Sequence, residues 1–398
     1  MNEFITVKLK DISTIYNGKT PSTSDENNFG GNIPWVTPRD LSNLKTQYIS
    51  KGERNISLQG FEAIGGKYLP KGTILLSSRA PIGLLAIANN PLTTNQGFKN
   101  IVCDGEKIDY LYLYYLLKDK VLDIENLGSG TTFKEVSKNI LEDFSIKIHK
   151  NLKTQQSIAA VLAALDKKIA LNKQTNTRLE EMAKTLYDYW FVQFDFPDAN
   201  GKPYKSSGGK MVFDETLKRE IPKGWEVKSL GEIADLYQPA TLSEKELKKN
   251  GQFLVYGANG IIGKYNQFNH ENPVVAVACR GNSCGAINIT QPKSWITGNA
   301  MVVNPKNKNM CIDYIKNTLL VNNLDKVISG SAQPQITRTN FAPLKVILPS
   351  EALLKLYSDI VNSMFNKRIN QIQQNAKLTQ LRDFLLPMLM NGQVSVAE

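Results

Sequence analysis

The sequence contains one structural unit twice, with a period close to half its length. The segment 130–148 aligns with 330–348 at a constant offset of 200 residues, so that Val136 meets Ile336. The tripeptide at 108–110 recurs at 312–314, and the segment that begins each half is also similar. A repeat of this length predicts two copies of one domain rather than a single large fold.

Each half ends in a long helix whose apolar residues recur in alternating steps of four and three. Steps that average 3.5 residues over this length predict a coiled-coil seam. Two core helices of a larger bundle are the alternative, but both seams are polar at their centres. If the helices pack antiparallel, Asn172 is expected near Gln371, where such a pair would fix register. The seam positions repeat at one offset and are Leu165, Asn172, Leu179 and Leu186 in the first helix, and Met364, Gln371, Leu378 and Leu385 in the second.

In the two globular parts, Phe4–Lys150 and Trp225–Pro349, short apolar runs alternate with turn residues, which predicts strands. The predicted class is α+β: two mixed, mostly β domains alternating with two long α-helices that pack as an antiparallel coiled coil. Apolar residues outside the seam, among them Leu152, Val161, Tyr187 and Phe191, are expected to face partners. The expected boundaries are a first domain at 1–150, a helix at 151–194, a linker at 195–222, a second domain at 223–350, a helix at 351–390 and a C-terminal tail at 391–398.

The net charge favours a polyanionic partner. Lys and Arg outnumber Asp and Glu by 48 to 37, which gives +11 at pH 7, and such a surplus attracts nucleic acid. No apolar run approaches the roughly 18 residues that a membrane helix needs. The N-terminus also lacks the layout of a signal peptide, so the cytoplasm is the expected location. The four cysteines form no C-x-x-C pair, so no metal site is predicted.

Catalytic motifs are missing from the sequence. Gly18-Lys19-Thr20 ends like a phosphate-binding loop, but Ser13 stands where the first glycine belongs. The chain has no Pro-Pro pair, which the catalytic loop of an amino-methyltransferase would require. A protein without catalytic residues of its own is therefore expected.

The turns are rich in side chains that contact DNA. Arg reads guanine, Asn and Gln read adenine, and Ser, Thr and Lys hold bases or phosphates. Several occur at matching points of the two halves: Arg79 with Arg280, and Asn95 with Asn299. The candidate DNA-binding residues are Asn17, Lys19, Thr20, Thr37, Arg39, Ser78, Arg79, Thr94, Asn95, Gln96, Ser129, Thr131, Thr132, Gln238, Asn259, Arg280, Asn282, Thr297, Asn299, Ser331 and Gln333.

Several stretches, together with the order of variable half and long helix, resemble one known family along nearly the whole chain. The family is the specificity subunit of type I restriction–modification systems. The stretches are IPWVTPRD at 33–40, LDKKI at 165–169, LEEMAK at 179–184, DANGKPYKSSGG at 198–209, EIPKGW at 220–225 and LTQLRDFLL at 378–386.

This resemblance implies a function without catalytic residues. In such proteins each globular half reads one part of a split site in double-stranded DNA. The helices set the spacing and dock two methyltransferase subunits, which bind S-adenosylmethionine and methylate adenine N6. Two restriction subunits that use ATP and magnesium can join them. The alternative is a stand-alone DNA-binding regulator or architectural protein, which would not need exposed helix faces for partners.

Overall fold

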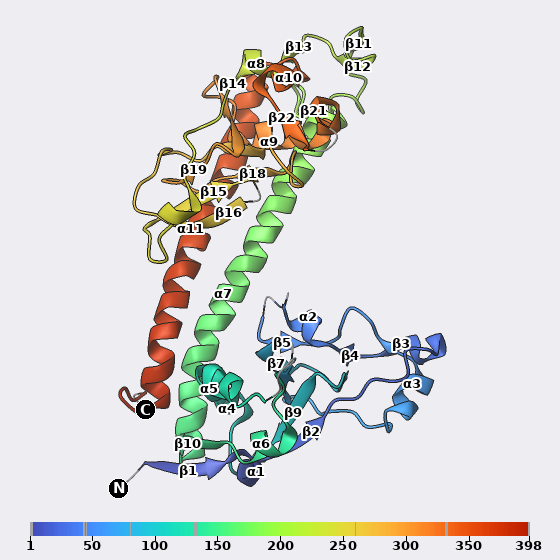
Figure 1. Cartoon of the computed structure of the whole chain (residues 1–398). Helices are drawn as coiled ribbons and strands as arrows, with labels where there is room; N and C mark the ends of the chain where they lie inside the picture. The colour runs from blue at the N-terminus through green and yellow to red at the C-terminus, as the bar shows by residue number, and fades with distance from the viewer. Residues whose placement is uncertain are drawn as a thin grey trace. The chain divides into compact units, whose positions relative to one another are not determined.

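The structure is a computed structural model that describes residues 3–42, 44, 46–79, 81–129, 134–258, 260–330 and 333–396. Small sheets and short helices alternate with two long helices, which confirms the predicted α+β class (Figure 1). The chain divides into two compact units, Met1–Lys173 with Gln373–Glu398, and Gln174–Ile372. Each unit holds its own sheets and about one half of each long helix.

The first unit is built on a five-stranded sheet with the strand order β2-β9-β6-β7-β5. Its neighbours are antiparallel except β5 and β7, which run parallel. Separately, β1 pairs with β10, and β4 pairs in parallel with β8. The elements are β1 (Phe4–Lys8), α1 (Leu9–Ile12), β2 (Ser13–Asn17), η1 (Glu26–Asn28), β3 (Phe29–Ile33), β4 (Trp35–Val36), α2 (Pro38–Ser42), β5 (Tyr48–Ile49), α3 (Leu58–Ala63), β6 (Ile74–Ser78), β7 (Ile82–Ala88), β8 (Thr93–Thr94), β9 (Phe98–Cys103), α4 (Tyr110–Asp119), α5 (Val121–Asn126), α6 (Lys138–Glu142), β10 (Ser145–His149), the first part of α7 (Leu152–Tyr187) and the last part of α11 (Glu351–Met390).

Helix α4 lies at the centre of the first unit's core. It begins after Asp109, whose carboxylate accepts a hydrogen bond from the Tyr112 N–H at 2.8 Å. Six consecutive residues, 112–117, are buried, so the helix is covered on all sides. The same apolar cluster contains Ile158 and Leu162 of α7, which attaches this domain to the long helix.

The second unit repeats this plan with shorter strands. A four-stranded sheet has the order β14-β20-β17-β18, and a three-stranded sheet has the order β16-β15-β19. The second copy of the repeated tripeptide, at 312–314, begins helix α9. The elements are the last part of α7, the π-helical turn η2 (Asp188–Val192), β11 (Met211–Asp214), β12 (Arg219–Pro222), β13 (Glu226–Ser229), α8 (Leu230–Ile233), β14 (Ala234–Tyr237), η3 (Glu244–Glu246), β15 (Phe253–Gly257), β16 (Gly260–Tyr265), β17 (Val275–Ala278), β18 (Ile287–Ile289), β19 (Trp295–Ile296), β20 (Ala300–Pro305), α9 (Ile312–Val321), η4 (Leu324–Val327), β21 (Ile328–Ser329), β22 (Gln335–Ile336), α10 (Arg338–Phe341), β23 (Lys345–Leu348) and the first part of α11.

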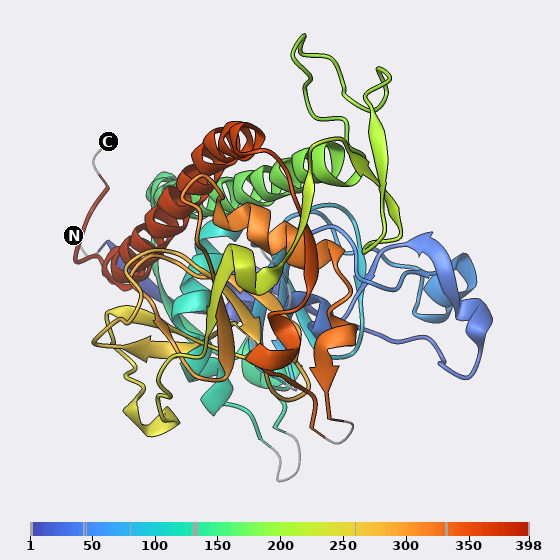
Figure 2. The same ribbon diagram turned by 90° about the horizontal axis from the view of Figure 1, so that it is seen from above.

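The segment expected to be a plain linker, 195–222, is folded. It carries the β11–β12 hairpin, which projects from the second unit (Figure 2). Phe196 stacks on Tyr204 with ring centroids 4.6 Å apart and on Trp225 at 5.0 Å. The Gly, Ser and Lys residues between these aromatic rings gave the segment the composition of a linker.

The two long helices run antiparallel within each unit. In the first unit, the Asn172 amide donates to Gln374 Oε1 at 2.7 Å and to Asn375 Oδ1 at 2.8 Å. These partners lie about one turn beyond Gln371, the residue expected to pair with Asn172. A helical side chain leans toward the N-terminus of its own helix, which in an antiparallel pair is the direction of rising numbers on the partner. In the second unit, Asn176 donates to the Arg368 carbonyl at 3.4 Å.

Two of the apolar side chains that were expected to face partners are buried instead. Tyr187 and Phe191 are each 5% exposed in the core of the second unit. The Tyr187 hydroxyl lies 3.0 Å from Thr318 Oγ1 of α9, and Phe191 packs edge-on against Tyr314. The end of α7 therefore belongs to the core of the second domain. None of the helices in the described part of the chain combines the length and apolar character that a membrane span requires.

Candidate nucleic-acid interface

The same backbone hydrogen bonds frame one edge of the sheet in both units. In the first unit, the Val136 N–H donates to the Ser78 carbonyl at 3.0 Å, and the Ser78 N–H donates to Gly97 at 2.8 Å. In the second unit, the Ile336 N–H donates to the Cys279 carbonyl at 3.0 Å, and the Cys279 N–H donates to the Asn299 carbonyl at 3.0 Å. We call these bonds the peptide frame. It confirms the predicted alignment of Val136 with Ile336.

Arg79 and Arg280 occupy the same position in the two frames, directly after the framed strand. Arg79 forms an isolated β-bridge with Glu135, and Arg280 forms one with Gln335. Arg79 is half-buried and Arg280 is exposed. The expected structural match between the two arginines is therefore confirmed, while their surroundings differ.

The match expected between Asn95 and Asn299 is wrong by two residues. The Asn95 N–H donates a hydrogen bond to the Val36 carbonyl. In the second unit, the Thr297 N–H donates the equivalent bond to the Tyr256 carbonyl. Asn299 is instead equivalent to Gly97. The Gly97 carbonyl accepts a hydrogen bond from the Ser78 N–H, and the Asn299 carbonyl accepts the equivalent bond from the Cys279 N–H. The second loop has the same length but places its amide side chain two residues later.

Three candidate loops of the first unit lie together beside the β4–β8 pair. The Lys19 N–H donates to the Thr94 carbonyl at 2.8 Å, and the Trp35 ring N–H donates to the Lys19 carbonyl at 3.1 Å. Thr20 hydrogen-bonds to Gln96, and Thr37 donates to Asp40 at 2.8 Å. The segments 17–20, 37–39 and 94–96 thus form one surface. Ser129 reaches the frame through paired backbone bonds with Glu135.

The second unit brings its candidates together around Cys279. The Gln238 amide donates to Cys279 Sγ at 2.9 Å and to the Gly298 carbonyl at 3.3 Å. The Gly281 N–H donates to the Pro334 carbonyl at 3.1 Å. This bond holds the loop after Arg280 against the segment that follows Gln333. Burial raises the pKa of the Cys279 thiol, so the sulfur stays protonated and serves as a packing atom.

Burial separates the candidates that can face DNA from those that support the loops. Ser78, Thr94 and Thr297 are at most 2% exposed. Ser78 accepts from the Lys99 ammonium at 3.2 Å, and Thr94 accepts from the Asn100 amide at 2.8 Å. The remaining described candidates are exposed or half-buried: Asn17, Lys19, Thr20, Thr37, Arg39, Arg79, Asn95, Gln96, Ser129, Gln238, Arg280, Asn282, Asn299 and Gln333. Thr131, Thr132, Asn259 and Ser331 lie outside the described residues.

Several residues of this surface were not predicted from the sequence. Lys67 lies 4.4 Å above the Tyr16 ring and lines a cavity of about 190 Å³ together with Lys19 and Asn17. Glu135 pairs with Lys99 at 3.0 Å. Only the Gly65-Gly66 turn just before Lys67 could have indicated this loop, because the other contacts join residues far apart in the sequence.

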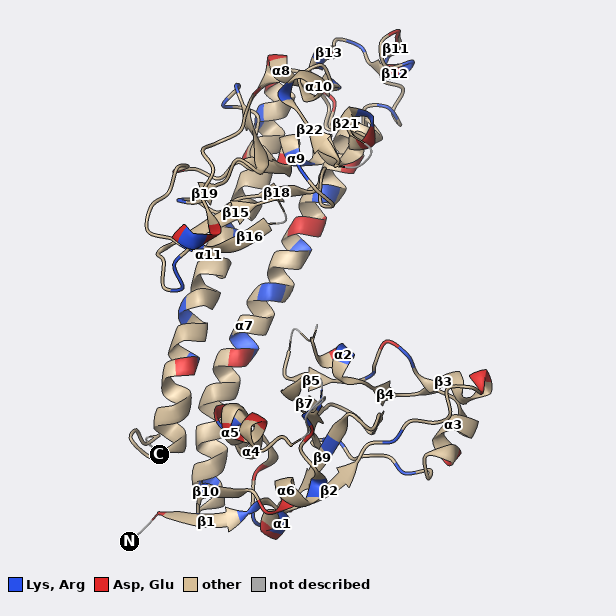
Figure 3. Ribbon diagram, in the orientation of Figure 1, with Lys and Arg blue, Asp and Glu red and all other residues tan. Residues whose placement is uncertain are grey.

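Lys and Arg are spread over both units and both long helices rather than gathered in one run (Figure 3). The described residues contain no group of three or more His, Cys, Asp or Glu side chains that could hold a metal ion. All four cysteines are free, and burial raises the pKa of Cys103 to about 12 and that of Cys311 to about 11. Such thiols are poor nucleophiles and poor metal ligands.

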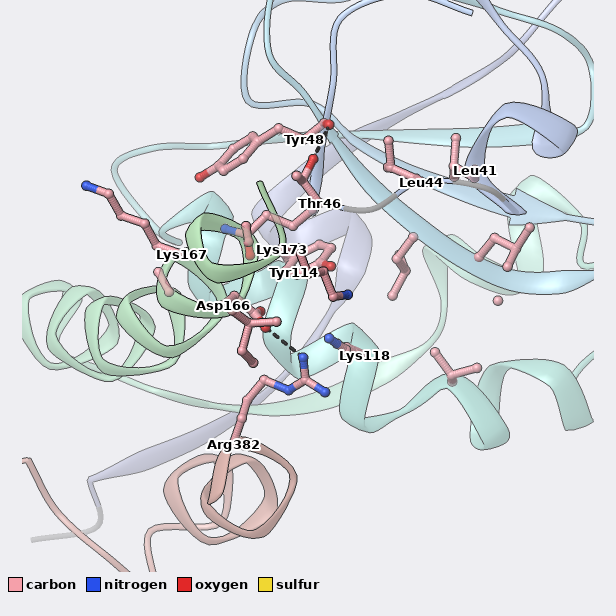
Figure 4. A pocket seen from close by; sticks show the side chains of 18 residues that line it. Leu41, Leu44, Thr46, Tyr48, Tyr114, Lys118, Asp166, Lys167, Lys173 and Arg382 are labelled. Atoms are coloured by element: carbon pink, nitrogen blue, oxygen red, sulfur yellow. Dashed lines mark hydrogen bonds and ion pairs between the residues drawn. The ribbon is translucent and has the colours of Figure 1, made fainter. Parts of the chain in front are cut away.

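A carboxylate of α7 attaches a helix of each globular domain to the long helices. In the first unit, Asp166 accepts from Arg382 of α11 at 2.6 Å and from the Tyr115 hydroxyl of α4 at 2.8 Å. Figure 4 shows Asp166 and Arg382 facing each other beside a pocket of about 640 Å³, which Lys118 also lines. In the second unit, Glu180 pairs with Arg368 of α11 at 3.2 Å and with Lys316 of α9.

Other apolar side chains on the long helices are open to solvent. In the first unit these are Leu171, Leu381 and Phe384, and in the second unit Met182 and Leu356. Phe384 is the most exposed of them, at 63%. Leu381 and Phe384 are three residues apart and so lie on the same face of α11.

Most of the chain is similar to one family of known proteins. The family described as type I restriction modification DNA specificity domain matches residues 1–181 and again residues 222–380. The chain is 33% identical to the type I restriction enzyme MjaIX specificity subunit of Methanocaldococcus jannaschii, over 98% of this chain and 93% of that protein. It is 24% identical to the type I restriction enzyme EcoprrI specificity subunit of Escherichia coli, over 89% of this chain and 88% of that protein. The crystal structure of the type I restriction-modification S subunit from M. genitalium has the same fold, with a TM-score of 0.63 and 18% identity over 97% of this chain and 96% of that one.

Proposed function

The chain belongs to the family of type I restriction–modification DNA specificity subunits, and from this membership we propose that it reads a DNA target in two separate parts. A specificity subunit is non-catalytic, and the activity of its system resides in partner subunits. The observation that carries the two-part reading is the peptide frame, which presents different side chains in the two units. Two similar readers with different contact residues suit a split and asymmetric site.

The two readers are residues 1–150 and 223–350. In the first, the exposed loops that contain Asn17, Lys19, Arg39 and Gln96 face the DNA. In the second, the loops that contain Gln238, Arg280 and Asn299 do so. Arg79 and Arg280 lie at the same place in each reader, next to strand ends. Exposed amides, hydroxyls and cations on framed loops are the groups that read base edges and hold phosphates.

The long helices, 151–194 and 351–390, act as the spacer between the two parts of the target. A helix of about 36–40 residues extends roughly 55–60 Å, which exceeds one turn of DNA at about 34–36 Å. The hydrogen bonds of Asn172 to Gln374 and Asn375 support a single register, since amides in an apolar seam tolerate few alternatives.

The exposed apolar side chains of these helices dock methyltransferase subunits, two in the complete complex. Those subunits bind S-adenosylmethionine and transfer its methyl group to adenine N6. Restriction subunits that use ATP and magnesium complete the system where they are present. Leu381 and Phe384 support this role, because both are open to solvent on α11 beside the Asp166–Arg382 contact.

Sequencing of methylated adenines tests the proposal. The chain is produced together with the methyltransferase subunits of its host, and DNA exposed to the purified complex is sequenced. We expect one motif with two defined parts separated by undefined bases, and no methylation by the chain alone. A continuous motif would contradict the two-reader proposal, and sequence-specific binding without any methyltransferase in the complex would favour a stand-alone regulator.

A further inference from the structure

Glu135 binds two cations at the edge of the first reader. Its carboxylate lies 3.0 Å from the Lys99 ammonium and 4.0 Å from the Arg79 guanidinium. The Lys99 side chain is 6% exposed and also donates to Ser78 Oγ at 3.2 Å. A buried ammonium needs a counter-charge, and Glu135 supplies it while its second oxygen faces Arg79 at ion-pair distance.

The second unit has a neutral pair at the same two positions. Glu135 forms a backbone β-bridge with Arg79, and Gln335 forms the equivalent β-bridge with Arg280. In the β6–β9 ladder, Lys99 lies opposite Leu76, and in the β17–β20 ladder the equivalent position opposite Val277 is occupied by Met301. The Lys99–Glu135 ion pair of the first reader is thus replaced by Met301 and Gln335.

This replacement leaves the two arginines in different electrostatic states. Arg79 has a carboxylate 4.0 Å away on one side, close enough to attract its guanidinium but not to hydrogen-bond with it. Arg280 is exposed and forms no ion pair with any residue that the structure describes. A planar guanidinium that a neighbour already orients loses less freedom when it forms a bidentate contact. A free cation instead gains most from neutralising a phosphate.

We propose that Glu135 is a positioning residue that directs Arg79 to a base edge, whereas Arg280 binds the DNA backbone. This inference rests on the proposed DNA-reading function and adds to it a division of labour between equivalent arginines. Guanine is the base expected opposite Arg79, because its N7 and O6 accept the bidentate contact.

The chain supplies its own matched variant. Replacement of Glu135 alone would leave the Lys99 ammonium buried without a counter-charge and could unfold the domain. The double variant Lys99→Met with Glu135→Gln instead installs the pair found in the second unit. The reciprocal change Gln335→Glu alters an exposed residue and places a carboxylate beside Arg280. Thermal unfolding of each variant establishes that it is folded.

The measurement is DNA affinity as a function of salt, with the full chain in its methyltransferase complex. The probes are a duplex that carries the preferred sequence and duplexes with single base-pair changes. Arg79→Ala should lower discrimination at one base pair by roughly 5- to 150-fold and leave the other positions unchanged. Arg280→Ala should weaken binding equally on all duplexes and reduce the salt slope by about 1.

The double variant decides the proposal. It should lose discrimination at the Arg79 position and gain salt dependence, while Gln335→Glu should reduce the salt dependence. A folded double variant with unchanged discrimination and an unchanged slope would overturn the role of Glu135. If the unaltered complex shows no sequence preference, the DNA-reading function itself fails, and this outcome is distinct from failure of the variants alone.

Discussion

Arg382 of α11 donates a hydrogen bond to Asp166 of α7 at 2.6 Å, with both side chains mostly buried, at 16% and 14% exposed. The same carboxylate accepts from Tyr115, so one acidic group joins both long helices to the core of the first recognition domain. Loss of this carboxylate removes one of the two acidic partners of the Arg382 guanidinium, which keeps its hydrogen bonds to Asp383. Asp166→Ala is therefore expected to destabilise the first unit by roughly 1–3 kcal/mol. Denaturant unfolding measures the effect, and Asp359→Ala, which breaks an exposed pair with Lys355, should change stability far less.

The spacer role predicts that helix length sets the distance between the two parts of the target. Duplication of one heptad in each helix, residues 170–176 and 369–375, adds about 10 Å while it preserves the phase of the seam. The undefined part of the methylated motif should lengthen by roughly three base pairs, at about 3.4 Å each. The same duplication in one helix alone should abolish sequence-specific methylation. A motif of unchanged spacing in the double insertion would exclude the spacer role.

The docking role predicts variants that lose the methyltransferase subunits while their folding stability is unchanged. Phe384→Ser removes an apolar ring that is 63% exposed on α11, so it should leave the unfolding midpoint unchanged. Co-purification of methyltransferase subunits should fall strongly, because exposed apolar anchors carry much of the binding energy of an interface. Phe213→Ser is the matched control, since Phe213 is 58% exposed on the β11 hairpin. Equal loss of partner with both variants would argue against α11 as the docking surface.

Thr94 should matter for stability and not for sequence preference. Thr94→Val removes the hydroxyl that accepts from Asn100 and leaves a buried amide with one partner fewer. We expect a loss of about 1–2 kcal/mol in unfolding free energy and an unaltered methylation motif. Gln96→Ala, at the exposed end of the same loop, should instead leave the unfolding free energy unchanged and alter the methylation motif. A changed motif in folded Thr94→Val would move Thr94 into the contact surface.

Protonation of the histidines should lower the folding stability of the protein in mildly acidic solution. Burial lowers the pKa of both His149 and His270 below the usual value of 6.5. The folded state then keeps each imidazole neutral while the unfolded chain takes up protons, so stability should fall as the pH decreases below about 6.5. Unfolding midpoints at pH 7.5 and 5.5 measure the difference. His149→Phe, which preserves the ring contact with Phe4, should reduce it, and an undiminished difference would assign the effect to other groups.

The parts of the fold that the sequence predicts are those with a regular repeat. The antiparallel long helices follow from the heptad spacing, and the match of Val136 to Ile336 follows from the internal repeat, which the peptide frame reproduces in the structure. Contacts between distant segments were not predictable in this way. Lys99 and Glu135 are separated by 36 residues, and no local pattern marks them as a pair. Tyr187 looked like part of an exposed helix face because α9, which covers it, follows more than a hundred residues later.

The loop surface was predicted by residue type but not by geometry. Hydroxyls and amides at turns indicated binding, yet Ser78, Thr94 and Thr297 use the same chemistry to hold the loops together. Composition also misrepresented the segment 195–222, where a few aromatic rings outweigh many small polar residues. Burial is a property of the assembled domain, so the sequence gives the inventory of contact groups and the fold selects among them.

The peptide frame bears on how such a protein changes its target over generations. The bonds from Val136 to Ser78 and from Ile336 to Cys279 use backbone atoms alone, so their chemistry is the same whichever side chains flank them. Exposed positions such as 280 and 335 can therefore mutate with little effect on folding. A protein under selection for novel targets can drift through many loop sequences while its scaffold remains intact, and each half can do so independently.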